Sequence, residues 1–119
     1  MAGQGFLTTH ILDTARGVPA AGVQLHLYRI ENGQQVPVSR AITNADGRTD
    51  APLIAKGDLT VGTYEIVFQI GAYFQGYAPA SAQPFLDIVP IRFGIDDAES
   101  HYHVPLLASP FGFSTYRGS

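Results

Sequence analysis

Hydrophobic and polar residues alternate along most of this chain with a period of two, which is typical of β-strands that bury one face. In the segment 6–12 the alternation places Phe6, Thr8, His10 and Leu12 on one face and the intervening residues on the other. The same pattern predicts further strands in the segments 22–30, 36–43, 62–70, 85–95 and 101–109.

Turn signals separate these segments. An Asn-Gly pair within 31–34 lies between two strand patterns and predicts a tight hairpin, and the polar cluster 44–50 predicts a second turn. The segment 71–78 is expected to form the one helical turn, and a short one. Pro90 and Pro105 are expected to confine parts of their strands to sheet edges or bulges, because proline lacks a backbone N–H. Seven or eight strands with one short helix indicate an all-β sandwich.

The composition and charge of the chain limit the kinds of molecule that it can bind or pack against. At 119 residues, 45% hydrophobic and 14% charged, the chain is expected to form a single domain over residues 1–119. A net charge of −3, with one lysine and six scattered arginines, offers no basic surface for nucleic acid or an anionic membrane. No apolar stretch is long enough to cross a bilayer. The low charge indicates that part of the surface faces protein, so an oligomer is expected.

The absence of cysteine excludes disulfides, thiolate catalysis and cysteine-ligated zinc, and it permits a reducing compartment. The N-terminal segment 1–10 has neither the basic nor the apolar region of a secretory signal, so a soluble cytoplasmic protein is expected. The chain contains no nucleophile-elbow, phosphate-loop or dinucleotide-binding motif. Covalent acyl transfer therefore has little support.

Two histidines in the segment 101–107 are the most distinctive candidates for chemistry. In an extended strand, His101 and His103 point to the same face. Such a pair could ligate a metal ion with a third ligand, either His10 or an aspartate. It could equally supply a neutral imidazole that takes a proton from water near neutral pH. The remaining histidine, His26, is assigned to an outer face with no role.

An arginine and the last residues of the chain complete the candidate set. Arg48 lies in the second turn cluster, where it could pair with Asp46 or Asp50 or could steady negative charge that develops during a reaction. The last four residues, 116–119, combine an aromatic ring, a cation, a glycine and a hydroxyl, which is unusual for a frayed terminus. These residue types favour direct attack by water, with a histidine as base and the arginine stabilising charge.

Three stretches of the chain together resemble the transthyretin-related 5-hydroxyisourate hydrolases. They are LTTHILDTARGVPAAGV near the start, TNADGRT in the middle and HYHVPLLASPFGFSTYRGS at the end. The resemblance covers essentially the whole chain. The terminal Tyr-Arg-Gly-Ser is its most specific element, because the hormone carrier transthyretin shares the fold but lacks that ending.

The resemblance implies an all-β fold, namely a transthyretin-like two-sheet β-sandwich of seven to eight strands with one short helix. It implies a homotetramer, built as a dimer of dimers, with the sites in the channel between dimers. The implied reaction is hydrolysis of 5-hydroxyisourate, the product of urate oxidation, to 2-oxo-4-hydroxy-4-carboxy-5-ureidoimidazoline in purine catabolism. No metal and no organic cofactor is implied.

The family's site residues can be carried over one by one onto this sequence. The implied catalytic residues are His10, Arg48 and His103, and the implied substrate-binding residues are His10, Arg48, His101, Tyr116, Arg117, Gly118 and Ser119. Neither the resemblance nor the residue types decide which histidine is the base. The alternatives are a transthyretin-type carrier of a small ligand without catalysis, a structural sandwich module, and a histidine metal site.

Overall fold

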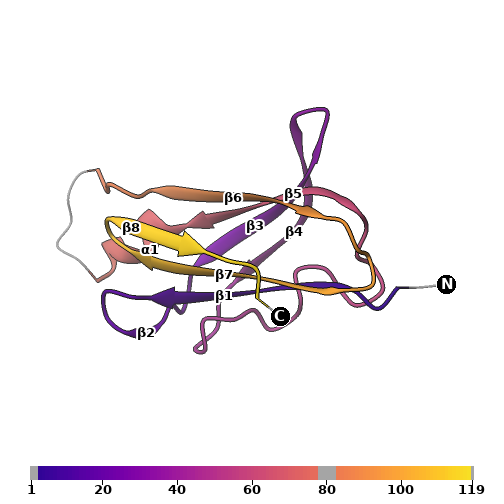
Figure 1. The fold of residues 1–119 in the computed structure, drawn as a ribbon. Coiled ribbons are helices and arrows are strands. Elements are labelled where there is room, and N and C mark those ends of the chain that lie inside the picture. The colour runs from indigo at the N-terminus through magenta and orange to yellow at the C-terminus, as the bar shows by residue number, and fades with distance from the viewer. Residues whose placement is uncertain (1–2, 78–82, 119) are drawn as a thin grey trace.

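Two four-stranded sheets pack face to face in the computed structural model, which describes residues 3–77 and 83–118 (Figure 1). One sheet has the order β2-β1-β7-β8. Its strands are β1 (Phe6–Asp13), β2 (Val18–Pro19), β7 (His101–Ser109) and β8 (Gly112–Thr115). The other sheet has the order β4-β3-β5-β6. Its strands are β3 (Gln24–Glu31), β4 (Gln34–Ile42), β5 (Gly62–Gln69) and β6 (Ile88–Ile95). The expected all-β sandwich is confirmed.

The core lies between the two sheets and is built by the period of two. Residues of β1 alternate strictly between half-buried and buried, with Leu7 and Ile11 fully inaccessible to solvent. On the facing sheet, Tyr64, Ile66 and Phe68 of β5 share the buried face, as their alternation predicts. Full burial of each such side chain stabilises the fold by about 2 kcal/mol. The outward faces are therefore free to carry polar residues.

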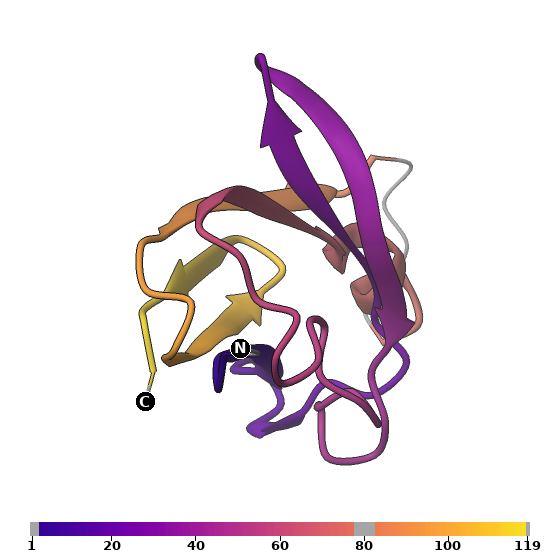
Figure 2. The ribbon, with the colours of Figure 1, turned by 90° about the vertical axis from the view of Figure 1, so that its right-hand side faces the viewer.

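The Asn-Gly hairpin is confirmed at the tip of β3 and β4. Asn32 and Gly33 both have positive φ, 53° and 77°, which is the combination that a type I′ turn requires. This hairpin extends beyond the body of the sandwich (Figures 1 and 2). The short helix α1 (Ile70–Gln75) begins one residue before the predicted segment, and residue 78 lies outside the described residues. No helix among the described residues is long and apolar enough to span a bilayer.

The two strand prolines differ from each other. Pro90 lies on β6, an edge strand, as expected. The same expectation is wrong for Pro105, which lies inside β7 between β1 and β8. The carbonyl of Pro105 accepts a hydrogen bond from the Thr115 hydroxyl, so its backbone faces the β8 side. On the β8 side, the hydrogen-bonded ladder ends at the pair Leu106–Thr115, one residue after Pro105. The N–H that proline lacks is therefore not needed there, and the pairing of β7 with β1 continues without interruption.

The parallel pairing of β1 with β7 brings the two ends of the chain together. Phe6 lies opposite His101, Thr8 opposite His103 and His10 opposite Pro105. These residues point to the outer face of the sheet, because their neighbours in sequence are buried in the core. His10 lies 91 residues before His101 and 93 before His103 in the sequence, and all three therefore share one surface.

Candidate active site

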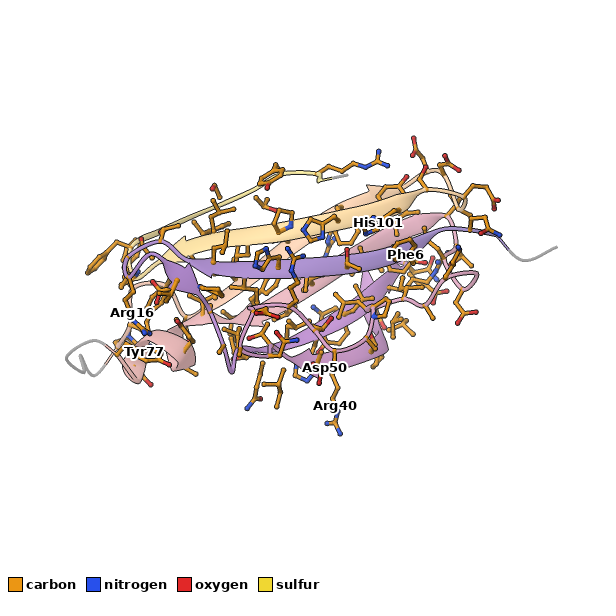
Figure 3. The ribbon with its side chains drawn as sticks, turned by 90° about the horizontal axis from the view of Figure 1, so that it is seen from below. Phe6, Arg16, Arg40, Asp50, Tyr77 and His101 are labelled. Atoms are coloured by element: carbon orange, nitrogen blue, oxygen red, sulfur yellow. The ribbon has the colours of Figure 1, made fainter. Side chains whose placement is uncertain are left out.

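Thr8 lies between the two histidines of β7. Its Oγ1 is 2.6 Å from Nε2 of His101 and 2.8 Å from Nδ1 of His103. The His101 ring also stacks on Phe6, with ring centroids 3.9 Å apart and planes 7° from parallel (Figure 3). Sequence reasoning did not single out Thr8. The available signal was its place in the alternation, on the same face of β1 as His10.

Arg48 reaches this face because the turn before it packs tightly on β1. The backbone N–H of Ile11 donates to the carbonyl of Gly47 at 2.8 Å, and Arg48 forms an isolated bridge with His10. Gly47 has φ of 74°, and a Cβ at this position would overlap the carbonyl oxygen of Ile11. Only glycine combines this backbone conformation with so close an approach. The turn thus places Arg48 directly beside His10.

The guanidinium of Arg48 is exposed and forms no ion pair within the described part of the chain. Pairing with Asp46 or Asp50, which the sequence left open, does not occur. The Asp50 carboxylate instead accepts a hydrogen bond from the Asn44 amide at 3.0 Å. Arg48 therefore keeps its donors available for a bound anion or carbonyl.

The C-terminal tail returns over β7 and covers His103. The N–H of Gly118 donates to the carbonyl of His103 at 2.7 Å, and a Cβ on Gly118 would lie 2.7 Å from Cδ2 of the His103 ring. Tyr116 and Gly118 line a cavity together with His101 and His103.

Of the two remaining residues of the tail, the structure describes Arg117. The guanidinium of Arg117 lies 4.0 Å from the ring centroid of Tyr102, whose side chain is buried on the opposite side of β7 from the histidines. The Arg117 guanidinium therefore packs on Tyr102, although Arg117 also lines the cavity that His101 and His103 line. Ser119 lies outside the described residues.

The local environment favours neutral imidazoles. Partial burial lowers the pKa of His10 below its ordinary value, and the nearby positive charge of Arg48 lowers it further. Burial also lowers the pKa of His103, followed by the charges of Arg48, His101 and His10. Nε2 of His10 lies 3.0 Å from the carbonyl oxygen of Asp46. A carbonyl only accepts, so this nitrogen carries the proton of neutral His10.

A cavity of about 370 Å³ lies between the β1–β7 face and the turn, lined by residues that include Thr8, Arg48, His101 and His103. This volume suits a small heterocycle. Among the described residues, no group of three or more histidine, cysteine, aspartate or glutamate side chains is arranged to hold a metal ion. The arrangement can therefore bind a polar ring, stabilise an oxyanion and exchange protons through imidazoles.

Known proteins share this fold and sequence. The model of the HIUase/Transthyretin family matches residues 7–118. A 5-hydroxyisourate hydrolase of Deinococcus radiodurans is 55% identical over 119 residues, with all of both chains covered. The crystal structure of (S)-allantoin synthase superposes with a TM-score of 0.92 at 49% identity, covering 99% of this chain but 45% of that one. The Klebsiella pneumoniae 5-hydroxyisourate hydrolase structure superposes with a TM-score of 0.76 at 35% identity, covering 100% and 97%. The chain belongs to the HIUase/Transthyretin family.

Proposed function

We propose that this chain is a 5-hydroxyisourate hydrolase, which uses water to open the six-membered ring of its substrate and forms 2-oxo-4-hydroxy-4-carboxy-5-ureidoimidazoline. One observation carries the proposal: an unpaired guanidinium, Arg48, lies beside His10 and shares a cavity with His103, and both imidazoles have lowered pKa values. The full-length similarity to a hydrolase of that name supports the same substrate.

The first chemical step is attack by water. A neutral imidazole, on His10 or His103, takes one proton from a water molecule as its oxygen bonds to the carbonyl carbon of a ring amide. The electron pair of the carbonyl moves to its oxygen, which becomes an oxyanion. Arg48 stabilises that charge with its fork of N–H donors. Because both imidazoles are held neutral, a base is available at neutral pH.

The second step opens the ring. The oxyanion re-forms its carbonyl, the bond between this carbon and the ring nitrogen breaks, and the nitrogen takes up the proton held by an imidazolium. The new carboxylic acid then ionises, and the site returns to its neutral state. Water and substrate supply every atom, so no cofactor enters the scheme.

Substrate binding is assigned to Arg48 and the C-terminal tail. The substrate is a flat ring system rich in carbonyl and N–H groups, and Tyr116 can donate and accept hydrogen bonds at its edge. Gly118 keeps the tail close over His103. Arg117, His101 and Ser119 remain in the proposed binding set on the family resemblance, and Arg117 and His101 line one cavity.

The proposed enzyme works as a homotetramer, a dimer of dimers, in the cytoplasm, and residues 1–119 form one domain of it. The location of the site supports the assembly. Its residues lie on the outer face of a sheet, and Arg48 and Tyr116 are exposed in the single chain. A second subunit over this face would exclude bulk water from the reacting groups. Sedimentation, limited proteolysis and cell fractionation test these three statements.

The proposed activity can be measured with substrate made in place. Urate oxidase converts urate to 5-hydroxyisourate, and the ultraviolet decay of that compound is followed with and without this protein, since it also decays unaided. We expect acceleration in proportion to protein. Arg48→Ala and His103→Asn should each lower kcat/KM by about 100-fold or more.

His26→Asn is the matched control for the histidine variant. His26 lies on the other sheet, where its ring stacks with Tyr28, and we expect this variant to keep full turnover. Decay at the uncatalysed rate with folded wild-type protein would contradict the proposal. Thyroxine binding by that same preparation would then favour the carrier.

A further inference from the structure

The hydrogen bonds of Thr8 restrict where two histidine rings can hold their protons. A threonine hydroxyl carries one proton and can accept two hydrogen bonds. Its Oγ1 lies within 2.6 Å of Nε2 of His101 and 2.8 Å of Nδ1 of His103. Within the described chain these two nitrogens are its only hydrogen-bond partners. When both rings are neutral, the hydroxyl proton is therefore satisfied only if one ring offers a lone pair.

Two arrangements make both hydrogen bonds with the hydroxyl proton satisfied. In the first, Nε2–H of His101 donates to Thr8 and Thr8 donates to Nδ1 of His103, so His103 carries its proton on Nε2. In the second, Nδ1–H of His103 donates to Thr8 and Thr8 donates to Nε2 of His101. Only the second leaves a lone pair on Nε2 of His103, the nitrogen that faces away from Thr8.

The charges around His103 favour the second arrangement. The groups that act on it are Arg48, His101 and His10, and none of these is an anion. Arg48 and His103 line the same cavity, and a positive charge there makes a lone pair on an imidazole nitrogen exposed to it more stable than an N–H bond. Among the described residues, no hydrogen bond reaches Nε2 of His103. That nitrogen is thus left open to a water molecule in the site.

We infer that Thr8 is a positioning residue that holds His103 with Nδ1 protonated and Nε2 free, which makes His103 the general base. This inference rests on the proposed function. His10, whose Nε2 is committed as a donor to Asp46, takes the orienting or proton-donating role.

The same hydrogen bonds form a path for the proton. When Nε2 of His103 takes a proton from water, the Nδ1 proton passes to Oγ1 of Thr8, and the hydroxyl proton passes to Nε2 of His101. The hydroxyl is restored, and the positive charge moves from His103 to His101. Stacking on Phe6 keeps the His101 ring in place to receive it. His101 therefore acts through Thr8, although it need not touch the substrate.

The tautomer can be read directly in the resting protein. In wild-type protein labelled with ¹⁵N-histidine, at a pH where His103 is neutral, we expect the His103 resonances of a ring protonated on Nδ1. Thr8→Val removes the hydroxyl at nearly constant volume and should shift His103 toward the Nε2–H form. Thr8→Ser keeps the hydroxyl and should retain the wild-type pattern. A wild-type His103 protonated on Nε2 would overturn the inference, whether or not Thr8→Val folds.

Kinetics provide the second readout. Thr8→Val should lower kcat by about 10-fold or more with KM changed by less than about 3-fold, and Thr8→Ser should restore most of the rate. Thr14→Val is the matched control, because the Thr14 hydroxyl bonds the Ala108 carbonyl and no histidine. Full kcat in folded Thr8→Val would overturn the inference while wild-type turnover upheld the proposed function. Absence of wild-type turnover would reject the function, and the tautomer would still be decided by resonance.

Discussion

At the scale of single residues, Arg48 has two electrostatic effects that support each other. Burial lowers the pKa of both His10 and His103, and the positive charge of Arg48 lowers both further, so the imidazoles stay unprotonated and able to accept a proton. In the proposed reaction, the same charge would stabilise the negative charge that develops on a carbonyl oxygen. A carboxylate partner would cancel both effects, and the described structure gives Arg48 none.

Replacing Arg48 with alanine should therefore raise the pKa of both histidines. Their lowered pKa values mean that the neutral, active form persists above the pKa and is lost as pH falls through it. Without the cation, the acid limb of the pH–rate profile should move to higher pH. Histidine NMR titration and the pH dependence of kcat/KM measure the shift. Arg48→Lys keeps the positive charge, so the acid limb of its pH–rate profile should remain at the wild-type pH while its kcat/KM falls. Unmoved histidine pKa values in Arg48→Ala would contradict this account.

Gly47 determines whether Arg48 reaches the site at all. Gly47→Ala places a Cβ against the Ile11 carbonyl at a positive φ, and we expect a loss of at least about 3 kcal/mol of unfolding free energy. Gly17 is the matched control, because its φ of 70° is similar but a Cβ there meets nothing within 4 Å. Gly17→Ala should cost only about 1–2 kcal/mol. Urea unfolding at fixed protein concentration compares them, and equal losses would show that the contact with β1 is unimportant.

At the scale of elements, helix α1 is tied to the end of β1 by a buried carboxylate. Asp13 is 1% exposed and accepts hydrogen bonds from the Tyr73 hydroxyl at 2.9 Å and the backbone N–H of Arg16 at 3.0 Å. The Arg16 guanidinium lies over the Tyr77 ring just after the helix (Figure 3). Asp13 is thus held by two donors, and the helix side of the link includes both Tyr73 and Tyr77.

Tyr73→Phe should cost about 1–3 kcal/mol near neutral pH, because it leaves one oxygen of a buried carboxylate without that donor. Burial and the bond to Asp13 raise the pKa of Tyr73 to about 12. The stabilisation is complete below the ordinary tyrosine value near 10 and is lost as pH rises toward 12. The stability difference between wild type and Tyr73→Phe should hence shrink across that window. Tyr77→Phe, which keeps its stacked ring, serves as control, and a difference that stayed constant with pH would refute the assignment.

Strand faces and turns could be predicted from the sequence, because both depend on neighbouring residues. The alternation in β1 separated its two faces, and the Asn-Gly pair identified the hairpin. Which strands pair depends on the whole chain. The interior position of Pro105 was missed because its nitrogen, which carries no hydrogen, faces a place where the β8 ladder has already stopped.

In the candidate site, too, some features depend on neighbouring residues and others depend on how distant strands pair. The resemblance of short stretches to the family indicated His10, Arg48 and His103. The role of Thr8 depends on the parallel register of β1 and β7, which places one hydroxyl between two rings. No short-range pattern reports that register. The direction of Arg117 was likewise unpredictable, since it is set by a ring, Tyr102, on the far face of β7.

At the scale of the whole molecule, two unpaired edges lie on one side of the sandwich. The strands β6 and β8 end their respective sheets there, next to each other (Figure 2). All four residues of β8 are exposed, and Ile88 at the start of β6 is 51% exposed. Open, apolar edges readily pair with another chain. They offer a contact through which the proposed dimers can form.

A charge on this edge should therefore break the assembly. Phe113 on β8 is 46% exposed, and we expect Phe113→Glu to yield smaller species in sedimentation. Val38 on β4, at the opposite edge of the other sheet, is 44% exposed, which makes Val38→Glu a control of matched chemistry and exposure. If a neighbouring subunit closes the site, Phe113→Glu should also lose turnover in proportion to its dissociation, while Val38→Glu keeps both. A dissociated yet fully active Phe113→Glu would show that one chain holds a complete site, and an intact assembly would place the subunit contacts elsewhere.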